Sequence, residues 1–184
     1  DYPKSLELYK LLKARVSTPE RRQMELTGML RSAAMSGNGE EIIHSASAVL
    51  SDAKVDPELA NEALHYRAKA LVEANQVQHA VKDWEELAKD TRNVYGAEAK
   101  YRLAQYLFDA GKTAEAEKEV LNYLEVSTPH AYWLARSFVL LSDIYAKLDR
   151  KLEARQYLLS LKQNYQADDD IAGMIESRLE KLNE

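Results

Sequence analysis

Apolar residues recur along this chain with the spacing of helices that bury one side. In five places a small or apolar residue is followed, four and then seven positions on, by bulkier apolar residues. Side chains at i, i+4 and i+7 lie on one stripe of an α-helix, so each set predicts a helix with one buried face. The five stripes are Ser5, Tyr9 and Leu12; Ile42, Ala46 and Val49; Ala80, Trp84 and Leu87; Ala116, Val120 and Tyr123; and Ala154, Leu158 and Leu161.

These stripes repeat at a nearly constant interval. Their first members lie 37, 38, 36 and 38 residues apart, which is the period of an array of helical repeats. A second apolar stripe with a small residue precedes each of the last four, so the sequence predicts four antiparallel helical hairpins. These preceding stripes are Leu26, Met29, Leu30 and Ala33; Leu64, Ala68 and Leu71; Leu103, Ala104 and Leu107; and Phe138, Leu141, Ser142 and Tyr145.

Capping residues and polar turns set the predicted boundaries. Helix starts are expected at Thr18-Pro19, Asp56-Pro57 and Thr128-Pro129, because a side-chain oxygen can accept from free N–H groups and proline fits the first turn. Short polar turns follow inside each hairpin. We predict one all-α domain over residues 1–184, made of a half-repeat at 3–15, hairpins at 19–51, 57–90, 94–126 and 129–165, and a capping helix at 168–183.

The two ends of the predicted array differ. Asp168, Asp169 and Asp170 are interpreted as a helix start rather than a metal site, because acidic side chains oppose the positive end of the helix dipole. The helix after them has one apolar stripe and otherwise charged faces, as a terminal cap requires. Residues 3–15 supply only the second helix of a hairpin. We therefore expect further repeats of the same parent chain on the N-terminal side, which makes this segment its C-terminal part.

The hairpins resemble tetratricopeptide repeats. In the family pattern a bulky residue is followed by leucine, a small residue and tyrosine at three, four and seven positions on, and later by alanine with phenylalanine four positions after it. One match is Phe138, Leu141, Ser142 and Tyr145 followed by Ala154 and Leu158. The other is Leu103, Ala104 and Leu107 followed by Ala116 and Val120. The resemblance implies a right-handed α–α superhelix that serves as a protein-interaction scaffold. The interval is longer than the family's roughly 34 residues, and HEAT-like and pentatricopeptide arrays stay open as alternatives.

Composition and charge narrow the partners. The chain has 30 acidic and 25 basic residues and a net charge of −5, which argues against nucleic acid and hence against the RNA-binding pentatricopeptide alternative. No apolar run reaches the roughly 20 residues that span a bilayer, so no membrane insertion is expected. Cysteine is absent, which leaves the compartment open. Residues 95–165 are similar to the repeats of bacterial cell-envelope tetratricopeptide proteins, which favours the periplasm or envelope, with the cytoplasm as the alternative.

No catalytic or metal-binding pattern accompanies the repeats. The four histidines have no spacing that places two ligands on one helix face, and Glu58, Glu62 and His65 are interpreted as a solvated polar stripe. Gly37-Asn38-Gly39 lacks the Lys-Ser/Thr that follows a phosphate-binding loop. We therefore expect no enzyme activity, no cofactor and no metal.

The resemblance also indicates where a partner would bind. In tetratricopeptide proteins the first helix of each hairpin lines a concave groove, and its residues off the core stripe contact a protein or peptide. The corresponding residues here are Arg31, His65, Lys69, Tyr101, Gln105, Phe108, Arg136 and Asp143, with Met24, Thr27, Val72 and Val139 beside them. Tyr101 and Phe108 share one face and either anchor a peptide or pack against neighbouring repeats. The alternative function is an architectural spacer or self-assembly segment with no groove in use.

Overall fold

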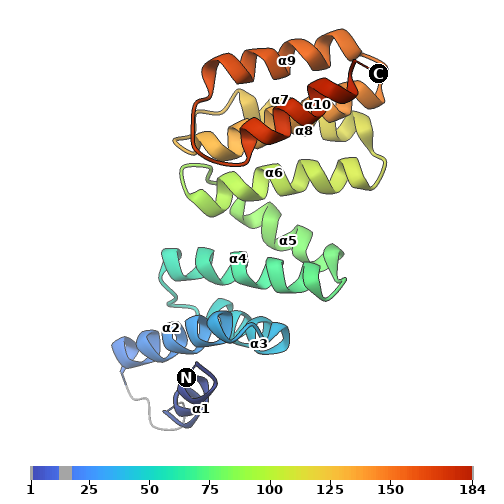
Figure 1. Cartoon of the computed structure of the whole chain (residues 1–184). Helices are drawn as coiled ribbons and strands as arrows, with labels where there is room; N and C mark the ends of the chain where they lie inside the picture. Colours follow the sequence, from blue (N-terminus) through green and yellow to red (C-terminus); the bar gives the residue numbers. More distant parts are fainter. Residues whose placement is uncertain (1, 13–17, 184) are drawn as a thin grey trace. The chain divides into compact units, whose positions relative to one another are not determined.

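The computed structural model describes residues 2–12 and 18–183, without the side chains of Lys10 and Leu12. These residues form ten α-helices and no strand, which confirms the all-α prediction. The chain divides into two compact units, Asp1–Leu87 and Ala88–Glu184, and Figure 1 labels the helices of both. Each unit is a succession of helices with its own apolar core.

The described residues of the first unit form five helices, each packed on the next. They are α1 (Tyr2–Leu12), α2 (Pro19–Ser36), α3 (Gly39–Leu50), α4 (Pro57–Glu73) and α5 (Val77–Leu87). α1 overlaps the predicted half-repeat at 3–15, of which residues 13–15 lie outside the described residues. The helices α2 and α3, and then α4 and α5, form two hairpins. One apolar cluster of this unit joins α2, α3 and α4 through Leu26, Leu30, Ala46, Val49, Leu59 and Ala63.

The second unit also contains five helices. They are α6 (Val94–Asp109), α7 (Thr113–Leu124), α8 (Ala131–Lys147), α9 (Lys151–Asn164) and α10 (Ile171–Lys181). The hairpins α6/α7 and α8/α9 pack through α7 and α8, their first helices α6 and α8 also contact each other, and α10 packs on both α8 and α9 (Figure 1). The stripe on α10 is buried at Ile171, Ile175 and Leu179, while its remaining faces are largely exposed.

The predicted stripes form the cores because small residues let neighbouring helices approach while larger ones fill the space between them. The fully or almost fully buried stripe residues include Ala46, Val49, Ala80, Leu87, Ala116, Val120, Tyr123, Ala154, Leu158 and Leu161. Each turn inside a hairpin contains one residue in the left-handed conformation, which ends the first helix sharply. These residues are Gly37, Asn75, Gly111 and Asp149, with φ between 58° and 76°.

Two of the three predicted proline-flanked helix starts are confirmed. The side chain of Thr18 accepts from the N–H of Arg21, and that of Asp56 accepts from the N–H of Glu58 at 2.9 Å. The predicted start at Thr128-Pro129 was wrong. There the Thr128 hydroxyl donates to the Thr91 carbonyl at 2.7 Å and tethers a loop, and α8 begins at Ala131.

Candidate functional site

Aromatic and arginine side chains gather on the first helices of the second unit. We call Tyr101 and Arg102 of α6, with Tyr132, Trp133 and Arg136 of α8, the Arg136 cluster. Tyr101 is 5% exposed, Tyr132 and Trp133 are half-buried, and the side chain of Arg102 is 43% exposed. The cluster therefore has a buried base and an accessible edge.

The rings and the guanidinium groups of the cluster stack on one another. The centroid of the Trp133 ring lies 5.6 Å from that of Tyr101 and 5.0 Å from that of Tyr132. The guanidinium carbon of Arg102 lies 5.7 Å from the centroids of both Tyr101 and Trp133, and that of Arg136 lies 5.1 Å from the Tyr101 centroid. These distances are within the range of cation–π attraction, which favours a positive charge over an aromatic face.

Arg136 holds the cluster together through hydrogen bonds. Its Nη1 donates to the Tyr132 hydroxyl at 2.9 Å and to Oδ2 of Asp170 at 3.0 Å, and its Nη2 donates to the Tyr101 hydroxyl at 3.2 Å. Burial acts to lower the pKa of Arg136, but the hydrogen bonds to Tyr101 and Tyr132 outweigh it and the pKa lies above its ordinary value. Arg136 therefore carries a fixed positive charge. Its Nε is buried and has no hydrogen-bond partner among the described residues.

A line of hydrogen bonds continues from this arginine along α6. The Tyr101 hydroxyl donates to Oε1 of Gln105 at 3.1 Å, and Nε2 of Gln105 donates to Oδ1 of Asp109 at 2.8 Å. The structure thus brings together three of the predicted binding residues, Tyr101, Gln105 and Arg136. Because Tyr101 is buried, its ring supports the cluster from beneath and only its polar end meets the other side chains.

The other predicted residues of this unit have separate partners. Phe108 is half-buried against the core, and Nζ of Lys147 lies 4.8 Å from its ring centroid. Asp143 accepts three hydrogen bonds from Arg178 of α10, at 2.8 to 3.0 Å. The prediction that Val139 lines a groove was wrong, because Val139 is 1% exposed and packs in the core that α10 completes.

In the first unit an ion pair and a ring contact involve the predicted residues. Arg31 of α2 donates to both carboxylate oxygens of Glu62 on α4, at 2.9 to 3.2 Å, and so links two first helices. The His65 ring lies 5.5 Å from that of Tyr66, and Lys69 is exposed. This face is therefore built around an ion pair rather than around aromatic rings.

Arg102 and Asp170 were not predicted as parts of a site. Arg102 lies one position beyond Tyr101, off the stripe from which the groove residues were chosen. Asp170 was interpreted only as a helix start, although it is Asp169 whose side chain accepts from the N–H of Ile171. The remaining signal in the sequence was the pair Tyr132-Trp133 at the start of the fourth hairpin. Trp133 packs against the third hairpin through its contact with Tyr101.

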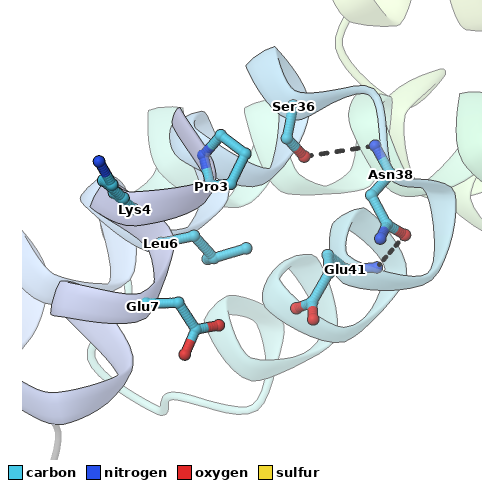
Figure 2. A pocket seen from close by; sticks show the side chains of 7 residues that line it. All are labelled: Pro3, Lys4, Leu6, Glu7, Ser36, Asn38 and Glu41. Atoms are coloured by element: carbon cyan, nitrogen blue, oxygen red, sulfur yellow. Dashed lines mark hydrogen bonds between the residues drawn. The ribbon is translucent and has the colours of Figure 1, made fainter. Parts of the chain in front are cut away.

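A separate cavity of about 450 Å³ lies in the first unit, between α1 and the turn that joins α2 to α3. It is lined by Pro3, Lys4, Leu6, Glu7, Ser36, Asn38 and Glu41, none of which was predicted as a binding residue (Figure 2). Asn38 borders it while its side chain accepts from the N–H groups of Glu40 and Glu41 at the start of α3. The cavity is therefore bounded by a helix cap and by the inner side of α1.

Two further findings concern metal binding and membrane crossing in the described part of the chain. No group of three or more His, Asp or Glu side chains there could hold a metal ion. None of the helices in residues 2–12 and 18–183 is both long enough and apolar enough to cross a membrane.

No protein-family model matches this sequence, and comparison with curated proteins finds no significant match. The candidate binding residues must therefore be judged by their own geometry and chemistry. On that basis the Arg136 cluster is the candidate site.

Proposed function

We propose that this chain is a tetratricopeptide-like interaction scaffold without catalytic activity, and that a peptide or protein binds across the first helices of its second unit. The proposal draws on the helices packed in consecutive pairs and on the repeat interval of 36 to 38 residues. The Arg136 cluster is the observation that carries it. Tyrosine, tryptophan and arginine are the residue types that dominate protein-binding hot spots.

The partner is expected to match the chemistry of the cluster edge. Arg102 and Trp133 offer a stacked guanidinium and indole, which suit an aromatic or aliphatic side chain beside a carboxylate. Arg102 is already paired with Glu98 at 2.9 Å, so a partner carboxylate would compete with a same-helix ion pair that is worth only about 0.3–0.5 kcal/mol. Giving up the pair with Glu98 would therefore cost the scaffold little free energy.

The test is selection of binders from a random peptide library, followed by calorimetric titration of the best peptide. Arg102→Ala is expected to weaken binding about tenfold or more, because a hot-spot arginine is removed. Arg155→Ala is the matched control, since Arg155 is an exposed arginine on α9 that donates to Asn183 and is not a member of the cluster. Tyr101→Ala is not suitable, because removing a buried ring would open a cavity in the core.

Two results would contradict the proposal. One is a selected peptide that binds wild type and Arg102→Ala equally well. The other is a peptide whose affinity falls by the same factor in Arg155→Ala, which would indicate a general loss of positive charge.

An architectural role is the second candidate, and one observation favours it. Polar bridges join separate helices: Arg31 and Glu62 join α2 to α4 in the first unit, and Arg136 and Asp170 join α8 to the start of α10 in the second. Such bridges stiffen an array and occupy side chains that a ligand would need. If no library peptide binds while amide exchange shows uniformly slow opening of α6, α8 and α10, the architectural role becomes the favoured function.

A further inference from the structure

One carboxylate balances the charge of Arg136. The Arg136 side chain is 21% exposed, and among the described residues only Asp170 places a carboxylate within ion-pair distance of it, with Oδ2 3.0 Å from Nη1. The other acceptors of its hydrogen bonds are the hydroxyls of Tyr101 and Tyr132, which carry no charge. A cation that is largely removed from water costs free energy unless an anion lies beside it. The position of Asp170 is therefore one that a carboxylate has to fill.

Asp170 fills this position through a single hydrogen bond. Arg136 donates to it through Nη1 alone, and Nη1 also donates to Tyr132. Three other arginines of the chain hold a carboxylate of another helix through two or more hydrogen bonds each. These pairs are Arg31 with Glu62, Arg67 with Asp83, and Arg178 with Asp143. Two-point pairs are the stronger ones, so the contact with Asp170 uses only part of the donor capacity of Arg136.

The helix that Asp170 precedes does not need its carboxylate. Asp170 occupies the N-cap position of α10, but its side chain makes no capping hydrogen bond. Oδ1 of Asp169 accepts from the N–H of Ile171 at 3.0 Å instead. α10 is also held by the buried side chains of Ile171 and Ile175 and by the bonds of Arg178 to α8. The side chain of Asp170, which is 54% exposed, is therefore able to leave Arg136 while α10 stays in place.

We propose that Asp170 holds the place of a partner's carboxylate, and that an acidic residue of the bound peptide displaces Asp170 from Arg136. Displacement by a peptide rests on the proposed function, and it makes the partner an acidic segment. The guanidinium carbons of Arg102 and Arg136 lie 5.7 and 5.1 Å from the same Tyr101 ring centroid, so one short segment reaches both. Such a segment carries two acidic residues, with an aromatic or aliphatic residue for Trp133 beside them.

The turn before α10 supplies the matched control for this exchange. Asp168 and Asp169 add two negative charges beside Asp170. Asp168 is exposed and makes no hydrogen bond or ion pair among the described residues. It therefore repels an approaching carboxylate as Asp170 does, but it does not occupy Arg136. Asp168→Asn removes the repulsion alone, whereas Asp170→Asn removes the same charge and also vacates the carboxylate position.

Acetate is a probe of this position that does not depend on any peptide. Sodium acetate replaces chloride at constant ionic strength while the Nε–H resonance of Arg136 is followed by NMR, because that group is buried and has no hydrogen-bond partner among the described residues. Asp170→Asn is expected to bind acetate about fivefold or more tightly than wild type, as the loss of a competing ion pair requires. Asp168→Asn should stay close to wild type. Equal titrations of the two variants, including no titration in either, would overturn the proposal.

Calorimetry with the best library peptide tests the displacement itself. Replacing the acidic residues of the peptide one at a time by Asn or Gln should identify one whose loss weakens binding to wild type. The unchanged peptide should bind Asp170→Asn about fivefold or more tightly than wild type, with a smaller gain in Asp168→Asn. The peptide without that acidic residue should bind Asp170→Asn no better than Asp168→Asn. Melting temperature and helicity are compared in all three proteins.

The results for displacement and for the scaffold are distinguishable. A peptide that depends on Arg102 but gains no more from Asp170→Asn than from Asp168→Asn would overturn the displacement of Asp170 and leave the proposed function standing. If no library peptide binds, the proposed function is contradicted, and the acetate titration still decides whether Asp170 occupies an exchangeable carboxylate position on Arg136.

Discussion

The ring of Tyr9 lies directly over the backbone of Gly28. A Cβ on Gly28 would come within 2.2 Å of Cζ of Tyr9, so only glycine allows α1 to approach α2 this closely. Gly28 sits in the interior of an 18-residue helix, where glycine normally costs about 1 kcal/mol relative to alanine. The close packing of Tyr9 offsets that cost.

Gly28→Ala is therefore expected to lower the free energy of unfolding of the first unit rather than raise it. The ring must move away, so a loss of about 1–3 kcal/mol is expected, as for overpacking elsewhere. Gly173→Ala in α10 is the matched control, because beyond its own stretch of helix nothing lies within 4 Å of the position of its Cβ. There helix propensity alone acts, and a gain of about 0.5–1 kcal/mol is expected. Urea unfolding measures both, and a gain in Gly28→Ala would show that the two helices do not approach this closely.

Ionisation of the buried Tyr123 phenol is expected to lower the free energy of unfolding at alkaline pH. Its side chain is 1% exposed, burial raises its pKa to about 12, and the nearby Thr128 hydroxyl opposes the shift only in part. Because the folded state holds the phenol proton more tightly than the unfolded state, this contribution to stability is complete below pH 10. It is lost as the pH rises from about 10 through about 12.

Tyr123→Phe tests this linkage. The Tyr123 hydroxyl is buried without a hydrogen-bond partner among the described residues, so at pH 7 the variant should unfold at the same or a slightly higher urea concentration. Between pH 10 and pH 12 wild type should lose stability faster than the variant. Tyr145 and Tyr165 also have pKa values raised to about 12, and they remain in both proteins. Parallel loss in the two proteins would exclude Tyr123 as the titrating group.

The contact between Asp143 and Arg178 is expected to hold α10 on α8. Both side chains are about one-third exposed, so Arg178→Met should cost on the order of 1 kcal/mol, near the upper end for ion pairs of this exposure. A double-mutant cycle with Asp143→Asn measures the coupling of the pair. Arg92→Met is the control, because the Arg92 side chain is 82% exposed and pairs with Asp90 only two positions away. A coupling energy near zero would mean that apolar packing alone holds α10.

Disrupting the apolar packing under α10 is expected to lower the free energy of unfolding more than removing the Asp143–Arg178 pair does. Ile175 is 2% exposed in a core shared with Leu158 and Leu161, so Ile175→Glu buries an unpaired charge. We expect α10 to detach, with a loss of at least about 3 kcal/mol and aggregation at room temperature. Ala172→Glu on the exposed side of the same helix should behave as wild type. Light scattering and calorimetry compare the two, and equal behaviour would refute the role of α10 as a cap.

Periodicity predicted the helices and their buried stripes because a residue's place on a helix depends only on its neighbours in sequence. It could not identify Asp83 and Glu25 as buried, since a charged residue between apolar ones is expected to face water. Asp83 is buried because Arg67 of α4 pairs with it, and Glu25 because Arg22 does. Such pairs depend on which helices meet in space.

The candidate site was predictable only in part, for a related reason. Tyr101, Gln105 and Arg136 were chosen from sequence because they lie on first helices outside the predicted core stripe, although Tyr101 is in fact buried in the core. Val139 was misplaced because α10 packs on α8 and covers it. A stripe shows that a helix has a buried side, but a second buried side appears only when a third helix is in position.

The proposal of a scaffold is tested most directly at Trp133, which lies inside the Arg136 cluster. Trp84→Phe leaves Trp133 as the only tryptophan, and its emission then reports on the cluster alone. Titration with the best library peptide should change the intensity or wavelength of Trp133 emission saturably, with the dissociation constant found by calorimetry, and Arg102→Ala should shift that curve about tenfold. A peptide that binds by calorimetry while Trp133 emission stays constant would place the binding surface elsewhere and contradict the account.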